Sequence, residues 1–154
     1  MKWIKRIFCF LLILGLYYLP SLVFKSDGEF YNNLNGPKLP SIVFPIVWAI
    51  LYVLLALHIM INFENRKKYN KSDFLRWFVF LLINYVISSS FSYFFFVKKD
   101  LFLGYVVTLF TLLSISLTCI ESLLLCKKSS ILLLPYILWG IVASIFGILL
   151  YLNN

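Results

Sequence analysis

The chain has 154 residues, of which 62% are hydrophobic, and its mean hydropathy is +0.94. Soluble domains contain roughly 45–50% apolar residues, so this composition excludes an ordinary soluble domain and indicates an integral membrane protein. The formal net charge of +8 could suggest nucleic-acid binding, but the cations lie in short groups between apolar stretches, as they do in membrane proteins. We therefore expect no nucleic-acid partner.

Five apolar stretches predict five transmembrane helices, at about 4–24, 41–63, 76–97, 101–125 and 130–152. Each is near the roughly 20 residues that a helix needs to cross a bilayer. A soluble five-helix bundle would show a polar stripe on each helix, and the sequence shows none. The predicted fold is therefore an all-α integral membrane protein in which residues 1–154 form a single five-helix bundle.

Within the first stretch, an uncharged run from residue 7 to residue 24 follows Lys2, Lys5 and Arg6, as the apolar core of a signal peptide would. No small-x-small cleavage site follows it, because Leu19-Pro20-Ser21 continues directly into Leu22-Val23-Phe24. We therefore interpret it as a retained first transmembrane helix.

The cations predict the orientation of the helices. Ten lie at residues 2–6, in the link 64–76 and at 127–128. Five spans place these three groups on one side of the membrane. Four lie on the other side, namely Lys25, Lys38, Lys98 and Lys99. Positive charge concentrates on cytoplasmic loops, so we expect the N-terminus inside and the C-terminus outside. The basic side also favours contact with anionic headgroups of the lipid bilayer.

The longest external link, about residues 25–40, contains the turn signal Asn35-Gly36-Pro37. It also contains Phe30, Tyr31 and Leu34, apolar residues that a solvated loop does not require. We expect this loop to fold back as a lid over the external end of the bundle. The alternative is that its aromatic residues anchor it among the lipid headgroups.

Two other links are short, at residues 98–100 and 126–129. Such links make consecutive helices antiparallel neighbours. Asp100 is placed to cap the fourth helix by accepting hydrogen bonds from its free amides.

Three predicted helices carry aromatic or polar residues on one face. The second helix carries Pro45, Trp48 and Tyr52. The third carries Asn84, Ser88, Phe91 and Ser92, with Ser89 and Ser90 beside them. The fifth carries Trp139, Ala143 and Phe146. Polar side chains at membrane depth are costly unless they face the bundle interior. Two tryptophans well inside the spans, near such groups, predict a pocket for a flat, mostly apolar ligand.

A structural interpretation competes with the pocket. Ser88-x-x-x-Ser92 and Ala143-x-x-x-Gly147 fit the small-xxx-small pattern of helix packing, in which these residues serve close approach alone. Trp3 and Trp77 lie near span ends, where an interfacial aromatic belt is the better interpretation.

Two ionisable residues lie in or near the spans. Glu121, within reach of Lys127 or Lys128, could couple protons in a transporter, but its position near the interface favours a structural role. His58 is interpreted as a lone interfacial histidine. No cluster of histidines, cysteines and carboxylates suggests a metal, so we expect no metal and no cofactor.

The chain resembles the TspO/translocator protein family, also known as tryptophan-rich sensory proteins or peripheral-type benzodiazepine receptors. The matching motifs are Val43-Phe44-Pro45-Ile46-Val47-Trp48 with Leu51-Tyr52, Asn84 with Phe91-Ser92-Tyr93-Phe94-Phe95, and Pro135-Tyr136-x-x-Trp139-x-x-x-Ala143. The resemblance implies a five-helix bundle, commonly a homodimer, in a bacterial cytoplasmic membrane. Family ligands include porphyrins such as protoporphyrin IX, and synthetic isoquinoline carboxamides and benzodiazepines.

The resemblance also implies a ligand pocket open toward the first loop, lined by Tyr31, Tyr52, Ser88, Ser89, Phe91 and Ala143 together with Trp48 and Trp139. We expect a porphyrin or similar flat ligand, bound for sensing, transport or light-dependent breakdown, in which Trp48 and Trp139 would be the reactive rings. The serines and Asn84 would offer hydrogen bonds to its carboxylates or its polar edge. The alternatives are a small proton-coupled transporter that uses Glu121 or His58, and a non-catalytic assembly protein.

Overall fold

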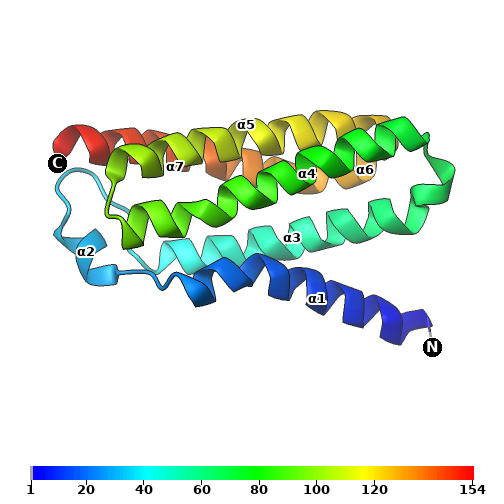
Figure 1. Cartoon of the computed structure of the whole chain (residues 1–154), viewed down its shortest axis with the longest axis horizontal. Helices are drawn as coiled ribbons and strands as arrows, with labels where there is room; N and C mark the ends of the chain where they lie inside the picture. Colours follow the sequence, from blue (N-terminus) through cyan, green and yellow to red (C-terminus); the bar gives the residue numbers. More distant parts are fainter. Residues whose placement is uncertain (1) are drawn as a thin grey trace.

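Five long helices run the length of a bundle in the computed structural model, which describes the backbone of residues 2–154 (Figure 1). They are α1 (Lys2–Val23), α3 (Val43–Asn65), α4 (Lys71–Ser92), α5 (Leu101–Leu125) and α7 (Leu134–Asn153). Side chains are described from residue 3, so Lys2, counted above among the cations, lies outside them. All five helices are long and apolar enough to cross a membrane, which confirms the predicted all-α five-helix membrane fold.

Short helical segments occupy the links between the long helices. They are α2 (Gly28–Asn33), η1 (Arg66–Lys68), the π-helical turn η2 (Tyr93–Val97), α6 (Lys127–Ser130) and η3 (Ile131–Leu133). The two termini lie at opposite ends of the bundle (Figure 1). The end that holds residues 25–40 and Asn154 is named the lid end, and the end that holds residues 64–76 and 126–130 is named the basic end.

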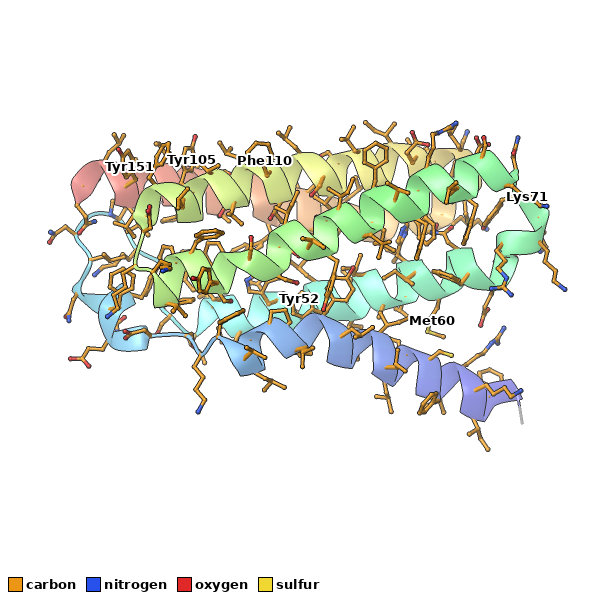
Figure 2. All side chains as sticks on the ribbon, in the orientation of Figure 1. Tyr52, Met60, Lys71, Tyr105, Phe110 and Tyr151 are labelled. Carbon is orange, nitrogen blue, oxygen red and sulfur yellow. The ribbon has the colours of Figure 1, made fainter. Side chains whose placement is uncertain are left out.

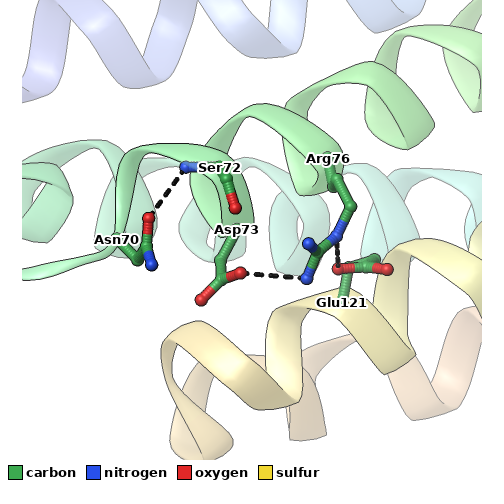
Figure 3. Close-up of polar contacts among 5 residues, drawn as sticks. All are labelled: Asn70, Ser72, Asp73, Arg76 and Glu121. Carbon is green, nitrogen blue, oxygen red and sulfur yellow. Dashed lines mark hydrogen bonds and ion pairs between the residues drawn. The ribbon is translucent and has the colours of Figure 1, made fainter.

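Polar side chains begin two of the long helices. Asp100 Oδ1 accepts a hydrogen bond from the Leu103 amide at 2.8 Å, which confirms its predicted role as the cap of α5. Asn70 Oδ1 accepts from the Ser72 amide at 3.0 Å and caps α4 (Figure 3). Each cap satisfies an amide that the helix itself leaves without a partner.

Helix α5 packs along both α4 and α7. The glycines of α7 face it: a Cβ built on Gly140 would lie 3.0 Å from Leu112 Cδ1, and one on Gly147 would lie 3.4 Å from Tyr105 Cδ2. Small residues at such positions let two helix backbones approach closely. For these glycines, therefore, helix packing is an adequate explanation.

A buried polar network joins α3, α4 and α6 near the basic end. His58 is fully buried, with Nδ1 2.9 Å from the carbonyl oxygen of Ser129, and Trp77 Nε1 donates to His58 Nε2 at 3.0 Å. Because a carbonyl oxygen can only accept, Nδ1 carries the hydrogen and Nε2 is the acceptor. Asn62 extends the network by accepting from Ser129 Oγ at 3.2 Å.

This network overturns two expectations. His58 is not interfacial, and Trp77, which is fully buried, is not part of an aromatic belt. The two residues face each other across the hairpin of α3 and α4, and nearness to a span end does not reveal which way a side chain points. Trp3, by contrast, is 73% exposed, as a belt residue would be.

Glu121 pairs with Arg76, whereas the sequence suggested Lys127 or Lys128 as its partner. Arg76 Nε lies 3.0 Å from Glu121 Oε2, and Arg76 Nη2 lies 2.9 Å from Asp73 Oδ1 (Figure 3). The ion pair therefore ties α4 to α5 at the basic end.

We expect Trp77→Phe to lower the thermal unfolding midpoint of the purified protein, measured by circular dichroism in detergent. The change removes the Trp77 donor at 3.0 Å and leaves His58 Nε2 with the longer contact to Asn62 Nδ2 at 3.2 Å. The loss of one buried hydrogen bond costs about 0.5–1.5 kcal/mol. Trp3→Phe is the matched control and should unfold at the wild-type temperature. Equal midpoints for the wild type and Trp77→Phe would show that the indole hydrogen bond does not stabilise the fold.

Candidate ligand-binding site

The loop that follows α1 folds back over the end of the bundle (Figure 1). Asp27 starts α2 by accepting a hydrogen bond from the Phe30 amide at 2.8 Å. Tyr31 is only 6% exposed, and it shares an apolar cluster with Leu34, Phe95 and Leu150. The loop thus contributes side chains to the interior at the lid end.

Two contacts hold the edges of this lid. On one side, Lys99 Nζ lies 3.0 Å from Asp27 Oδ2 and joins the lid to the turn before α5. On the other side, Asn154 Oδ1 accepts from the Asn35 amide at 2.8 Å, and Asn154 Nδ2 donates to the Asn35 carbonyl at 3.1 Å. The lid is therefore closed over the bundle.

Beneath the lid, α3 and α7 meet through two pairs of aromatic rings. Phe44 packs edge-on against Trp139 with centroids 5.9 Å apart, and Trp48 packs edge-on against Tyr136 at 5.5 Å. Since the two helices are antiparallel, the pairs lie about one helical turn apart. Edge-to-face packing is a favoured geometry for aromatic pairs. We name these four residues the aromatic ladder.

Further rings extend the aromatic ladder in both directions. Toward the lid, Tyr31 packs edge-on against Phe44 at 5.3 Å. Toward the basic end, Trp48 contacts Tyr52 at 5.3 Å, and Tyr52 contacts Tyr17 of α1 at 5.6 Å. Tyr52 lies about midway along the bundle (Figure 2). Aromatic rings therefore follow α3 in two adjoining groups from the lid to the middle of the protein, and we name this series the aromatic column.

Helix α4 contributes the polar wall. Asn84 is fully buried, and its Nδ2 donates to the Thr111 carbonyl at 3.2 Å and to Ser114 Oγ at 2.9 Å, both on α5. Ser88 Oγ donates to the carbonyl oxygen of Tyr85 at 3.2 Å. These donors therefore serve the fold, although both side chains face inward as predicted.

The remaining predicted site residues are spread around this column. Phe91 stacks on Phe95 at 5.1 Å in the lid cluster, whereas Ser89 and Ala143 are half-buried. Pro45 is exposed on α3. The structure thus brings Tyr31, Trp48, Tyr52 and Trp139 into one aromatic column, with Asn84 and Ser88 on the neighbouring helix, and it leaves Pro45 outside.

Sequence reasoning missed Tyr136, which lies at the centre of the site and is 2% exposed. Among the described side chains, its hydroxyl oxygen and Asn84 Oδ1 are the two fully buried polar atoms that have no hydrogen-bond partner. An unsatisfied buried polar group costs about 1–3 kcal/mol. The spacing Tyr136-x-x-Trp139 was a usable signal, because residues three apart share a helix face.

The outer side of the aromatic ladder opens onto an apolar groove of about 330 Å³ between α3 and α7. The groove is lined by Val47, Ile50, Leu51, Pro135, Leu138, Trp139 and Val142. Trp139 is therefore reachable from the groove, whereas the rings of the ladder fill the space between the two helices. A ligand that enters this space must part the rings.

No three His, Cys, Asp or Glu side chains gather closely enough to hold a metal ion within the described residues. The chemistry available at the site is that of aromatic faces, aliphatic walls and the polar atoms of Asn84, Ser88 and Tyr136.

Sequence comparisons identify relatives of this chain. A sequence model of the TspO/MBR family matches residues 8–152. The chain is 36% identical over 152 residues to the tryptophan-rich protein TspO of Bacillus cereus, which covers 97% of each protein. It is 34% identical over 149 residues to the uncharacterized membrane protein YtaB of Bacillus subtilis, which covers 93% of this chain and 92% of that protein. The chain is therefore a multi-pass integral membrane protein that belongs to the TspO/MBR family.

Proposed function

We propose that this protein binds flat, largely apolar tetrapyrroles such as protoporphyrin IX between α3 and α7. The observation that carries the proposal is the aromatic ladder, because its rings bridge two helices whose backbones stay apart along this stretch. Rings that meet edge-on can turn their faces to a flat ligand. The apolar groove beside Trp139 gives such a ligand a route from the membrane.

Opening the ladder is energetically feasible. Each edge-to-face pair contributes about 0.5–1.5 kcal/mol beyond its buried area. A porphyrin that takes the place of the ring contacts buries apolar area on both of its faces, at roughly 25 cal/mol per Å². The gain from a large flat ligand therefore exceeds the loss of two ring pairs.

The same placement supports light-dependent breakdown as one outcome of binding. Trp48 and Trp139 would contact the bound porphyrin, and an indole held against an excited porphyrin is in position to give up an electron. Sensing and transport would use the same bound state. The homodimer implied by the family resemblance stays a prediction.

Proton-coupled transport has less support. Glu121 is engaged by Arg76 at 3.0 Å, and His58 uses both ring nitrogens in the buried network. Both groups that could have carried protons are thus occupied in holding helices together.

Replacing both indoles should weaken porphyrin binding. For Trp48→Phe/Trp139→Phe in lipid nanodiscs, we expect the dissociation constant of protoporphyrin IX to rise at least about tenfold, which corresponds to about 1.4 kcal/mol. Porphyrin absorbance is the readout, because tryptophan fluorescence changes with the substitution. Trp3→Phe should bind as the wild type does, and an unchanged affinity in the double variant would exclude these rings from the site.

The contact between Asp27 and Lys99 should control lid opening. The hydrogen bond from the Phe30 amide, and to a smaller extent the Lys99 ammonium, holds the pKa of Asp27 below its ordinary value. The ionised Asp27 carboxylate therefore stabilises the closed lid. This stabilisation is complete at neutral pH, above the pKa of Asp27 in the unfolded chain, and is lost as the pH falls through the lower pKa of Asp27 in the folded protein. We therefore expect acidification below about pH 4 to loosen the lid, since a free Asp side chain titrates near that value.

At neutral pH, substitutions can remove the ion pair between Asp27 and Lys99 while the helix cap at residue 27 is kept. Lys99→Met and Asp27→Asn should each raise hydrogen exchange in α2 and speed porphyrin association. The rise in exchange should be only a few-fold, because an exposed ion pair is weak. Asp27→Asn removes the ion pair alone, because Asn still caps a helix. Lys98→Met is the control, because the Lys98 ammonium lies over the Tyr93 ring, away from Asp27. Equal exchange in Lys98→Met and Lys99→Met would show that this ion pair does not hold the lid.

A further inference from the structure

Four tyrosines meet where α1, α3 and α4 pack together, about midway along the bundle (Figure 2). The ring of Tyr52 on α3 lies 5.6 Å from Tyr17 and 5.1 Å from Tyr18, both on α1, as measured between ring centroids. Tyr17 in turn lies 5.2 Å from Tyr85 on α4. We name these four residues the tyrosine cluster.

The two ends of the bundle use mainly phenylalanine in their aromatic clusters. The phenyl rings at the lid end are those of Phe30, Phe44, Phe91, Phe95 and Phe96, and those near the basic end are Phe63, Phe74 and Phe78. Phenylalanine fills space without a polar atom, whereas a hydroxyl at membrane depth is costly unless it has a partner. The Tyr85 hydroxyl donates to the Leu16 carbonyl at 3.1 Å and so has a structural role. Packing alone does not explain why the other three rings are tyrosines.

Trp48 connects the tyrosine cluster to the candidate site. Its ring lies 5.3 Å from Tyr52, which lies 5.1 Å from Tyr18. Tyr18 is 36% exposed on a membrane-spanning helix and therefore faces lipid. Among aromatic side chains, indole and phenol lose an electron far more readily than phenyl does. The three rings thus form a path of oxidisable groups from the candidate site to the lipid face of α1.

Such a path can separate charge after photochemistry at Trp48. An indole that has given an electron to an excited porphyrin lies against the reduced ligand, so the electron returns quickly. Electron transfer slows steeply with distance. If Trp48 is refilled from Tyr52 and then from Tyr18, the electron vacancy moves two rings away from the ligand and the return is slowed.

We infer that Tyr52 and Tyr18 form an electron relay that refills Trp48 from a lipid-soluble hydroquinone in the membrane. Both residues act through Trp48, and neither needs to touch the porphyrin for this role. The inference rests on the proposed function, because a porphyrin bound beside Trp48 supplies the excited state.

The steps of the relay balance in electrons and protons. The excited porphyrin takes one electron from Trp48, and Tyr52 returns one electron to Trp48. The phenolic proton of Tyr52 passes to the reduced porphyrin, because separated charges are costly in the membrane interior. Tyr18 then gives a hydrogen atom, an electron and a proton together, to the Tyr52 oxygen. A hydroquinone hydroxyl gives a hydrogen atom to the Tyr18 oxygen, so one hydroquinone becomes a quinone as two porphyrins each gain one hydrogen atom.

Electron paramagnetic resonance tests the relay, because it distinguishes a phenoxyl radical from an indole radical. Protein in nanodiscs is loaded with protoporphyrin IX, illuminated without oxygen and frozen. The wild type should give a phenoxyl signal that narrows when the protein is made with ring-deuterated tyrosine. Tyr52→Phe should lose most of this signal, counted per bound porphyrin by absorbance so that a change in affinity does not enter. Tyr151→Phe is the matched control and should keep the signal, since Tyr151 packs on Phe102, away from Trp48.

A hydroquinone in the bilayer tests the lipid end of the relay. Added durohydroquinone should shorten the lifetime of the phenoxyl radical in the wild type. It should do so much less in Tyr18→Phe, because Tyr17, the other neighbour of Tyr52 on α1, is only 6% exposed. Tyr18→Phe also keeps the test decisive if Tyr52→Phe does not fold, since Tyr18 lies on the surface of the bundle.

The results separate this inference from the proposed function. If protoporphyrin IX binds in a manner that depends on Trp48 and Trp139, but the phenoxyl signal is absent or is equal in the wild type and Tyr52→Phe, the relay is wrong and the proposed function stands. If protoporphyrin IX does not bind, both are wrong. A signal that Tyr52→Phe removes and Tyr151→Phe keeps supports both.

Discussion

Within a bilayer, every polar group must find its hydrogen-bond partner inside the protein, and this constraint organises the whole chain. Helices satisfy the backbone, and many hydroxyls bond the preceding turn of their own helix, as Thr118 does to the Ser114 carbonyl and Ser144 to the Gly140 carbonyl. The His58 side chain is accommodated at full burial because Trp77 and the Ser129 carbonyl satisfy both ring nitrogens.

Against this background, the unpaired atoms of Tyr136 and Asn84 are informative. They do not lie at a frayed end but in the interior, beside the one region where α3 and α7 are bridged by rings. A fold that satisfies His58 so completely at the basic end could have satisfied these atoms as well. The same helices therefore combine a basic end built from paired polar groups with a middle and lid end built from packed aromatic rings.

Sequence reasoning reached the spans, the Asp100 cap and the aromatic faces, because these depend on hydropathy, on local capping and on residue spacing. It failed at Trp77 and His58, since hydropathy gives the depth of a residue and not the side of the helix that it occupies. In α3, apolar residues surround the helix almost uniformly, so no amphipathic pattern marks the inward face. Only the pairing of α3 with α4 shows that His58 meets Trp77.

Tyr136 was missed for a related reason. A tyrosine near a tryptophan in an apolar helix looks like packing, and its importance depends on which donors its neighbours have already used. That information lies in the contacts of Asn84 with α5 and of Ser88 with Tyr85, which no local pattern encodes.

The distribution of donors also bears on how a porphyrin could lie in this protein. Its carboxylates require cations or free donors, and the polar wall of α4 offers neither. Lys98 and Lys99 stand at the lid end, where Lys99 already closes the lid through Asp27. A porphyrin carboxylate placed there would compete with Asp27 for the same ammonium. In that orientation the ring system would point toward the aromatic ladder, and the ligand itself would weaken the contact that holds the lid over it.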